Sequence, residues 1–318
     1  MTKRWTTENI PSQRGRTFVV TGTGGLGFED ALALALAGGD VVIGGRDPTK
    51  GAAAVDRIRS VYGQAKISFQ EVDLADLGSV AAFGKRLAAN RDCIDVLINN
   101  AGVMTPPERR MTKDGFELQF GVNYIAHFAL TANLLPLLRR SSVSRVVTLS
   151  SIAARGGRIN FNDLQADRTY KPMPVYSQSK LACLMFAFEL QRRSDNADWG
   201  LTSIAAHPGI SRTNLLHNAP GRYSAQGLIR SALWFLFQPV AQGALSTLYA
   251  ATSPDAQASA YYGPTGLGEL RGYPGEAKVP PAALEHHVAS RLWEVSEELS
   301  GVRFGEASPS VRNLLAAM

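Results

Sequence analysis

Cysteines, export signals and membrane spans are scarce or absent in this sequence of 318 residues. Its two cysteines, Cys93 and Cys183, provide neither a disulfide framework nor the spacing of a metal site, so we expect both to be reduced, in a reducing compartment. Residues 1–8 contain no apolar segment of the kind found in secretory signal peptides. No uninterrupted apolar run approaches the roughly 18 residues that a membrane span needs. We therefore expect a cytoplasmic protein without a membrane span.

Long runs of one charge sign are absent as well, although the net charge is +6. Lysine and arginine are interleaved with acidic residues, which is typical of a solvated surface and argues against nucleic-acid binding. The sequence also has no internal repeat, no low-complexity segment and no linker that would divide it. With 45% hydrophobic residues the chain can form a full core, and we expect residues 1–318 to form a single domain.

Short apolar strands alternate with helices from residue 17 onward. The strands are predicted at residues 17–21, 40–43, 66–72, 95–98, 144–149 and 201–206. The helices are predicted at residues 28–37, 49–62, 77–89, 112–138 and 176–193. This alternation predicts an α/β fold with a doubly wound parallel sheet, a Rossmann fold. The carboxyl ends of the strands then meet at one edge, where ligands bind in such sheets.

Glycines directly follow the first strand, and a helix begins behind them. The turn is Gly22-Thr23-Gly24-Gly25-Leu26-Gly27. Glycines between a strand and a helix let the backbone approach a pyrophosphate, and the helix N-terminus supplies amide donors and a partial positive charge. We favour phosphate binding here over a tight turn without a ligand. The candidate contacts are Gly22, Gly24, Gly25, Leu26 and Gly27.

The end of the second strand lacks the carboxylate that binds the ribose 2′-hydroxyl of NAD(H) in many such folds. Gly44 and Gly45 are followed there by Arg46, with Lys50 nearby. An arginine at this place suits the 2′-phosphate of NADP(H). Asp47 leaves NAD(H) as the second option. The alternative for Arg46 and Lys50 is that both are ordinary exposed surface charges. We expect NADP(H).

Tyr176 and Lys180 are separated by three residues and therefore lie on the same face of the helix predicted there. A phenol alone titrates near pH 10, which makes it a poor proton shuttle at neutral pH. A neighbouring ammonium favours the phenolate, so such a pair can move a proton on or off an oxygen atom. The same spacing occurs by chance in many helices, so its meaning depends on the other motifs.

Asn123 lies on the apolar face of the helix predicted over residues 112–138. A buried amide needs hydrogen-bond partners. Asn123 therefore either makes a hydrogen bond within the core or holds a water molecule.

His207, Asn214 and His217 follow the last predicted strand of the alternating part. Neither cysteines nor a set of carboxylates accompany them, and zinc sites use such sets. We therefore expect no metal site.

Three segments lie outside the alternating part. Residues 1–15 are predicted to form an N-terminal arm anchored by Trp5 and Ile10. Residues 214–240 are apolar and aromatic, and we interpret them as a helical lid over the substrate pocket, with a core or subunit-contact helix and a peripheral membrane contact as alternatives. Residues 261–318 are predicted as a C-terminal extension with a short strand and a helix over residues 282–298. The apolar face of that helix comprises Leu284, Val288, Leu292, Val295 and Leu299.

A set of motifs resembles the short-chain dehydrogenases/reductases, in the branch of the retinol dehydrogenases and the WW-domain oxidoreductase. The matching pieces are Asp73-Leu74, Asn99-Asn100-Ala101-Gly102, Asn123, Ser151, Tyr176-xxx-Lys180 and Pro208-Gly209-xxx-Thr213. They occur in the order of the family, over about residues 15–300. The glycine-rich turn departs from it, because the family usually has Thr-Gly-xxx-Gly-x-Gly and this chain is one residue shorter.

The resemblance implies roles for four catalytic residues. Tyr176 would act as the general acid in ketone reduction and as the general base in alcohol oxidation. Lys180 would hold the ribose hydroxyls on the nicotinamide side of the cofactor. Ser151 would form a hydrogen bond to the substrate oxygen. Asn123 would hold a water that links Lys180 to solvent.

The same resemblance implies a set of cofactor contacts at the ends of the later strands. These contacts are Asp73, Leu74, Asn99, Ala101, Gly102, Pro208, Gly209, Ile210 and Thr213. Asn99 would support the cofactor, and Ala101 and Gly102 would lie beside its ribose. Ile210 and Thr213 would contact the nicotinamide carboxamide.

The resemblance thus implies an NADP(H)-dependent oxidoreductase, an alcohol dehydrogenase or carbonyl reductase, that interconverts a ketone or aldehyde and an alcohol by hydride transfer. The predicted apolar lid favours a bulky apolar substrate. Two alternatives stay open, an NADPH-dependent double-bond reductase and a non-catalytic dinucleotide-binding sensor. The expected partner is a small carbonyl or alcohol, and a homodimer is the one assembly we consider.

Overall fold

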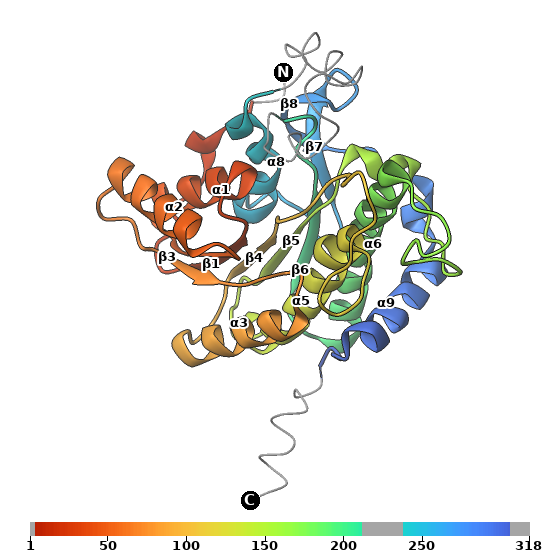
Figure 1. The fold of residues 1–318 in the computed structure, drawn as a ribbon. Coiled ribbons are helices and arrows are strands. Elements are labelled where there is room, and N and C mark those ends of the chain that lie inside the picture. Colours follow the sequence, from red (N-terminus) through yellow and green to blue (C-terminus); the bar gives the residue numbers. More distant parts are fainter. Residues whose placement is uncertain (1–3, 212–237, 306–318) are drawn as a thin grey trace, which may run out of the picture.

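The computed structural model describes residues 4–211 and 238–305. Within these ranges one sheet has the strand order β3-β2-β1-β4-β5-β6-β7-β8, with helices on both faces (Figure 1). Neighbouring strands run parallel up to β7, and β8 pairs with β7 antiparallel. The doubly wound parallel sheet predicted from the sequence is confirmed, with an antiparallel strand added at one edge.

The strands contribute side chains to two separate cores, one on each face of the sheet. The strands are β1 (Thr17–Thr21), β2 (Asp40–Gly45), β3 (Ile67–Glu71), β4 (Val96–Asn99), β5 (Arg145–Leu149), β6 (Thr202–Ala206), β7 (Tyr261–Gly266) and β8 (Arg271–Glu276). Because successive strand residues point to opposite faces, Val19 and Leu97 enter one core while Val20 and Ile98 enter the other. Burial on both faces explains why these strands are apolar throughout rather than alternating.

The helices form a layer on each face of the sheet. One layer contains α1 (Gly25–Leu36), α2 (Pro48–Val61) and α8 (Val240–Thr252). The other contains α3 (Leu77–Asn90), α5 (Ala126–Leu138), α6 (Pro172–Ala197) and α9 (His286–Ser300). Short helical turns are η1 (Thr7–Asn9), η3 (Ile152–Gly156) and η6 (Pro281–Leu284). The side chains of Asp47 and Asp76 cap α2 and α3, which determines where each helix begins.

The helix predicted over residues 112–138 begins later and is not uniform. Its first turn, α4 (Leu118–Phe120), leads through a π-helical turn, η2 (Gly121–Ile125), into α5. The preceding residues form a turn closed by a bridge between Met111 and Glu117. The predicted start at residue 112 is wrong because the carboxylate of Glu117 accepts the amide of Phe120 and thereby caps the helix there.

The stretch Leu118–Leu138 is the one helix among the described residues that is long and apolar enough to cross a membrane. Of its most apolar window, 83% is buried inside the protein. It packs against α3 and α6 in the larger of the two cores. Its apolar composition therefore follows from its place in the core.

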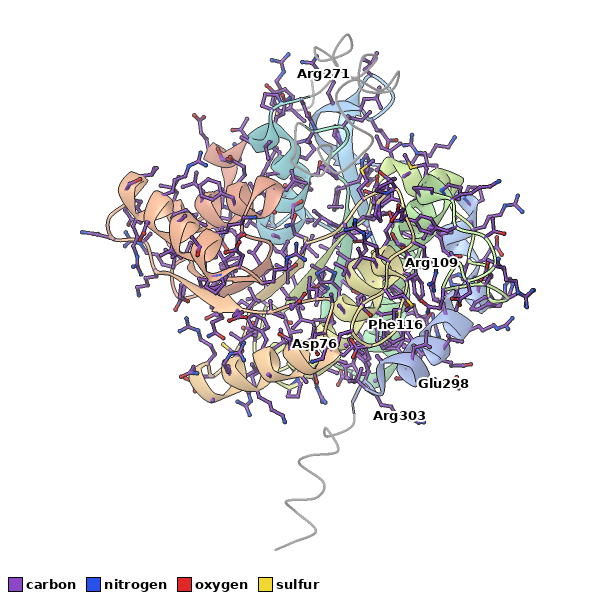
Figure 2. All side chains as sticks on the ribbon, in the orientation of Figure 1. Asp76, Arg109, Phe116, Arg271, Glu298 and Arg303 are labelled. Atoms are coloured by element: carbon purple, nitrogen blue, oxygen red, sulfur yellow. The ribbon has the colours of Figure 1, made fainter. Side chains whose placement is uncertain are left out.

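The C-terminal helix α9 packs on the body of its own chain, against α6 and α5. Its predicted apolar face is partly wrong, since Leu284 is 55% exposed whereas Trp293 is 1% exposed. Leu284 belongs to the preceding turn, so the buried stripe of the helix is rotated toward Trp293, which stacks on Phe186 of α6. Glu298 and Arg303 lie at the outer edge of the molecule (Figure 2).

The N-terminal arm packs against the α8 layer. Trp5 meets the ring of Tyr249 edge-on, with 5.4 Å between the ring centroids, and Ile10 packs against the same core. Both predicted anchors are confirmed. Residues 214–237 of the predicted lid lie outside the described residues, so the lid stays a prediction.

Asp30 is fully buried on the inner face of α1. Neither of its carboxylate oxygens has a hydrogen-bond partner among the described residues. Burial, with a smaller contribution from Glu29, raises the pKa of Asp30 well above its ordinary value. The folded protein therefore binds a proton at Asp30 more tightly than the unfolded chain does.

Replacing Asp30 with asparagine keeps the size of the side chain and removes its ionisation. Because the pKa of Asp30 is raised in the folded state, its ionisation costs no stability below the unfolded-state pKa. The cost grows as the pH rises from the unfolded-state pKa toward the folded-state pKa. We expect Asp30→Asn to raise the free energy of unfolding, measured in urea, by ~1–3 kcal/mol at pH 8 and by less at pH 5. Asp56→Asn, at an exposed carboxylate of α2, is the control. An equal gain at both pH values would contradict this explanation.

Candidate active site

The candidate site residues gather where the parallel strands end. Gly22 follows β1, Arg46 follows β2, Asp73 follows β3, Ala101 follows β4, Ser151 follows β5 and Pro208 follows β6. All six strands run in the same direction, so these residues lie along one edge of the sheet. This edge is the place expected for a ligand.

The glycine-rich turn after β1 is shaped by close packing. A Cβ on Gly22 would lie 2.8 Å from Nδ2 of Asn100, and one on Gly27 would lie 2.5 Å from the carbonyl oxygen of Gly22. Gly25 has a φ of +56°, which favours glycine. Gly24 provides no side-chain cap for α1, so the first amides of the helix are left to a ligand. Although one residue shorter than in the family, the turn suits a pyrophosphate.

Two residues not singled out from the sequence hold this turn, Asn100 and His127. Nδ2 of Asn100 donates to the carbonyl oxygen of Thr21 at 2.6 Å. The hydroxyl of Thr21 lies 2.9 Å from Nε2 of His127, whose Nδ1 lies 2.9 Å from the carbonyl oxygen of Asn123. A carbonyl only accepts, so Nδ1 carries the proton and Nε2 accepts from Thr21. Burial lowers the pKa of His127 to about 4, and the neutral ring therefore links the turn to Asn123.

Asn99 has its side chain in the core, and its predicted support of the cofactor stays a prediction. Its Nδ2 donates to the hydroxyl of Thr131 at 3.0 Å. Successive residues at a strand end point to opposite sides, so only one of the two asparagines reaches the glycine turn, and it is Asn100. The sequence signals for the missed pair were this adjacent asparagine and a histidine one helical turn after Asn123.

A cavity of about 640 Å³ opens at the ends of β1 to β4. Six residues predicted to bind the cofactor line it, namely Gly22, Arg46, Asp73, Leu74, Ala101 and Gly102. Val103, Met104 and Arg110, from the loop after β4, also line it and were not selected from the sequence. The volume suits a cofactor or small ligand, and the position corresponds to the adenosine half of a dinucleotide in this fold.

A cation is available in this cavity, whereas the neighbouring carboxylate is already bound. Oδ1 of Asp47 accepts the amide of Lys50 at 3.1 Å, and Oδ2 lies 3.7 Å from the ammonium of Lys50. Arg46 lines the cavity and makes no ion pair with another described residue. At the strand end itself, a Cβ on Gly45 would lie 2.7 Å from Cγ2 of Thr23, so any larger residue there would require the Thr23 side chain to move.

Tyr176 and Lys180 lie on the buried face of α6, and Lys180 is 6% exposed. The helix begins earlier than predicted, with Pro172 in its first turn. Nζ of Lys180 donates to the carbonyl oxygen of Leu149 at 3.0 Å, its one hydrogen bond to the described part of the chain. A Cβ on Gly102 would lie 3.6 Å from the same Nζ. The ammonium therefore lies beside the cavity with two of its three donors left for a ligand.

Asn123 lies in the π turn η2, and its side chain is fully engaged. Its Oδ1 accepts the amide of Val103 at 2.7 Å. Its Nδ2 donates to the carbonyl oxygen of Val103 at 3.0 Å and to the hydroxyl of Ser179 at 2.9 Å. The first alternative, a core hydrogen bond, therefore describes the side chain, which ties the loop after β4 to α6. A water bound at Asn123 stays a prediction.

Ser151 follows β5 and caps η3. Its Oγ accepts the amide of Ala153 at 3.2 Å, and the hydroxyl proton has no acceptor among the described residues. Burial raises the pKa of Tyr261, whose hydroxyl stays protonated and donates to the carbonyl oxygen of Ser151 at 3.3 Å. Ser150 is buried and donates to the carbonyl oxygen of Lys180 at 2.7 Å. Of the two adjacent serines, Ser151 is the one with an available proton.

The turn after β6 is fixed by its backbone. Gly209 has a φ of +63°, and a Cβ there would lie 2.4 Å from the carbonyl oxygen of Leu270. The amide of Ile210 donates to that same carbonyl at 2.8 Å. The turn is thus attached to the hairpin of β7 and β8. The described residues do not include Thr213, Asn214 or His217.

Comparison with known proteins gives matches along most of the chain. The sequence profile of the short chain dehydrogenase family matches residues 16–223. Mouse retinol dehydrogenase 14 is 38% identical over 91% of this chain and 86% of its own length. Zebrafish polyprenol dehydrogenase is 36% identical over 93% of this chain and 90% of its own length.

Solved structures share the fold. A crystal structure of an uncharacterized protein from Mycobacterium paratuberculosis covers 96% of this chain and 100% of that chain, with 38% identity and a TM-score of 0.79. The RhlG/NADP complex of Pseudomonas aeruginosa covers 79% of this chain and 94% of that chain, with 22% identity and a TM-score of 0.62. Together with the strand order and the edge at which the site residues meet, these matches show that the chain belongs to the short-chain dehydrogenase/reductase family, in the retinol dehydrogenase branch, and is an oxidoreductase that uses a nicotinamide dinucleotide.

Proposed function

We propose that this protein interconverts a bulky apolar ketone or aldehyde and the corresponding alcohol, with NADP(H) as the cofactor. The observation that carries the proposal is the buried ammonium of Lys180, one helical turn from Tyr176 and with a single hydrogen bond among the described residues. A buried cation without a carboxylate is costly unless other acceptors surround it. Ribose hydroxyls of a bound cofactor would supply those acceptors.

The residues around Lys180 provide the proton chemistry. The bound nicotinamide supplies the hydride in reduction and accepts it in oxidation. In reduction, the hydroxyl of Tyr176 gives its proton to the carbonyl oxygen of the substrate, and in oxidation the phenolate takes it back. The hydroxyl proton of Ser151 binds the same substrate oxygen, and this bond strengthens as negative charge develops there.

The remaining cofactor contacts fit the residues at the other end of the cavity. The first amides of α1 hold the pyrophosphate, because the turn leaves them uncapped and excludes side chains at Gly22 and Gly27. Arg46 binds the 2′-phosphate. The preference for NADP(H) is supported by Asp47, whose carboxylate already caps α2, and by Gly45, which provides no carboxylate at the strand end.

The substrate class is supported by the relatives. The names of the matched relatives specify retinol and polyprenol, both long apolar alcohols. A bulky apolar carbonyl or alcohol is therefore the first class to test.

Removing the phenol hydroxyl of Tyr176 tests the reaction. We expect Tyr176→Phe to lower kcat for NADPH-dependent reduction of bulky ketones or aldehydes by about 10²–10⁴-fold, since it removes the proton donor. NADPH binding, followed by fluorescence titration, is expected to stay near the wild-type value. Tyr62→Phe, a half-buried tyrosine at the end of α2, is the matched control. Undiminished turnover in Tyr176→Phe would refute the proposed acid/base role.

The coenzyme preference is tested at Arg46. We expect Arg46→Ala to raise the KM for NADPH by about 10–100-fold, the loss of one charge-assisted phosphate contact, with little change in the KM for NADH. Asp47→Asn keeps the helix cap and is expected to leave the NADPH-to-NADH ratio unchanged. A selective loss of NADH use in Asp47→Asn would instead place the ribose 2′-hydroxyl on Asp47.

A further inference from the structure

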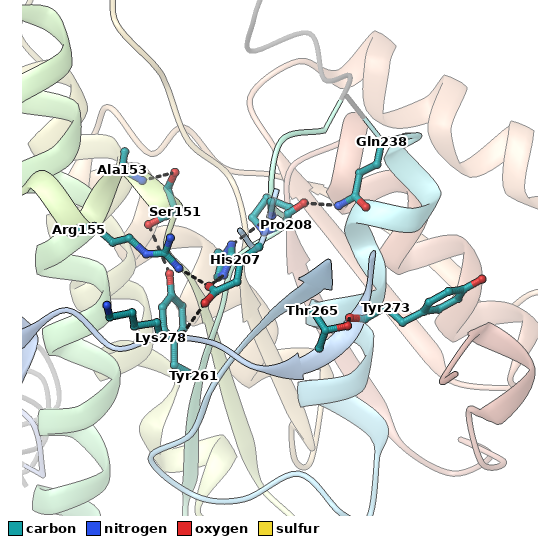
Figure 3. A network of polar contacts seen from close by, with 12 residues as sticks. Ser151, Ala153, Arg155, His207, Pro208, Gln238, Tyr261, Thr265, Tyr273 and Lys278 are labelled. Carbon is teal, nitrogen blue, oxygen red and sulfur yellow. Dashed lines mark hydrogen bonds and ion pairs between the residues drawn. The ribbon is translucent and has the colours of Figure 1, made fainter. Parts of the chain in front are cut away.

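A carboxylate next to the candidate active site joins three segments that are distant in the sequence. Glu269, in the turn between β7 and β8, forms an ion pair with Arg155 of η3. Its Oε2 lies 3.1 Å from Nε2 of His207, at the end of β6, and its Oε1 accepts the amide of Lys278 at 2.9 Å. Figure 3 shows Arg155 and His207 converging from opposite sides, with Tyr261 and Ser151 close by. The chemistry proposed above uses none of these side chains except Ser151.

The histidine in this network has a defined proton position. The amide of Gly209 donates to Nδ1 of His207 at 3.2 Å, so Nδ1 carries no proton. Nε2 therefore carries it and donates to Glu269. His207 is fully buried, and burial lowers its pKa, which keeps the ring neutral. The neutral ring links the turn after β6 to the carboxylate.

The backbone around this network has a close contact and several unfavourable φ angles. A Cβ on Gly263 would lie 1.9 Å from Nε2 of His207, so a glycine is needed for the ring to lie there. Glu269 itself has a φ of +67°, and it follows Leu267 and Gly268 with φ of +44° and +64°. Non-glycine residues in this left-handed region carry strain, which persists where the surrounding contacts compensate for it. Here the compensating contacts are those of the Glu269 carboxylate.

The network reaches the turn that carries Ser151. Arg155 lies in the same short helical turn, η3, that Ser151 caps. Tyr261, whose ring centroid lies 5.1 Å from that of His207, donates to the carbonyl oxygen of Ser151. Arg155 and Tyr261 thus hold the Ser151 turn from two sides.

The network also reaches the turn after β6. His207 accepts the amide of Gly209, as described above. The residue after Glu269, Leu270, accepts the amide of Ile210 at 2.8 Å. Gln238 donates from Nε2 to the carbonyl oxygen of Pro208 at 2.6 Å. The backbone assigned to the nicotinamide carboxamide is therefore fixed to the same hairpin that carries Glu269.

We propose that Glu269 is a positioning residue, which through Arg155 and His207 holds the Ser151 turn at a fixed place relative to the Pro208-Gly209 turn. The inference rests on the proposed function, in which Ser151 binds the substrate oxygen and the second turn faces the nicotinamide. Hydride transfer needs these two partners in a defined geometry, and a displacement of about 1 Å can cost on the order of 10²-fold in rate. Glu269 acts on the reaction only through these two turns.

The kinetic test uses Glu269→Gln, which keeps the shape of the side chain and removes its charge. We expect kcat to fall by about 10-fold or more, while the Kd for NADPH changes by less than about 3-fold. The matched control is Asp40→Asn, which removes the charge from a partly buried pair with Arg91 at the amino end of β2, at 3.1 Å. Equal effects of both substitutions on kcat would overturn the proposal, because removal of a charge elsewhere in the fold would then lower kcat just as much.

A double-mutant cycle tests whether Glu269 acts through Ser151. If it does, Glu269→Gln lowers kcat by less than about 3-fold in a Ser151→Ala background, because the group it positions is already gone. The same large loss in both backgrounds would contradict the proposed positioning of Ser151.

Hydrogen exchange provides a readout that needs no turnover. We expect Glu269→Gln to increase amide exchange in peptides from residues 150–157 and from residues 204–211, and Asp40→Asn to change neither. An increase confined to the hairpin, residues 261–278, would overturn the proposal. Arg155→Gln, at the more exposed partner of the ion pair, is the second variant if Glu269→Gln does not fold. If the wild-type protein reduced no carbonyl substrate, the proposed function would fail while exchange still tested the network.

Discussion

The hydroxyl of Thr21 connects three parts of the site that are distant in the sequence. It accepts the amides of Asn100 and Ala101 at 2.9 and 3.0 Å and lies 2.9 Å from His127. The ends of β1 and β4 and the helix that carries Asn123 therefore meet at one buried oxygen. The glycine turn follows Thr21 directly, so its position depends on these bonds.

The two ends of the cofactor site differ in how deeply their polar groups are buried and in how many of these groups are already hydrogen-bonded. At the adenosine end, Arg46 lines an open cavity and keeps its donors for a ligand. At the nicotinamide end the polar groups are buried, and most are already bonded, as Asn123 and Ser150 are. Two exceptions there are the ammonium of Lys180 and the hydroxyl proton of Ser151. A bound cofactor and substrate would complete the surroundings of these two groups, which fits a site that is formed before its ligands bind.

The C-terminal hairpin extends this arrangement beyond the parallel sheet. It adds β8 at the edge and supplies Tyr261, Glu269 and Leu270 to the two turns that follow β5 and β6. The hairpin is therefore part of the active-site framework. On the opposite face of the sheet from α1 and α8, α9 closes the larger core with Trp293 against α6, which stabilises the helix that carries Tyr176 and Lys180.

The errors of sequence-based prediction occurred where specific side-chain contacts, and not apolar periodicity, determine the bounds and the buried face of a helix. The helix with Asn123 begins at Leu118 because Glu117 happens to cap it, and such a cap depends on the turn closed at Met111. The buried stripe of α9 includes Trp293 because α6 presents Phe186 to it. Local periodicity contains no information about either neighbour.

By itself, the sequence determined the order of strands and helices, the sheet edge and the residue types along it, because apolar periodicity and glycine conformation are local properties. It could not assign the loop-supporting role to Asn100 rather than Asn99, since their side chains point to opposite sides of one strand end. Nor could it reveal the meeting of Arg155, His207 and Glu269, which come from three separate segments. Only the tertiary structure decides such contacts, because burial and hydrogen bonding between distant segments depend on how the whole chain packs.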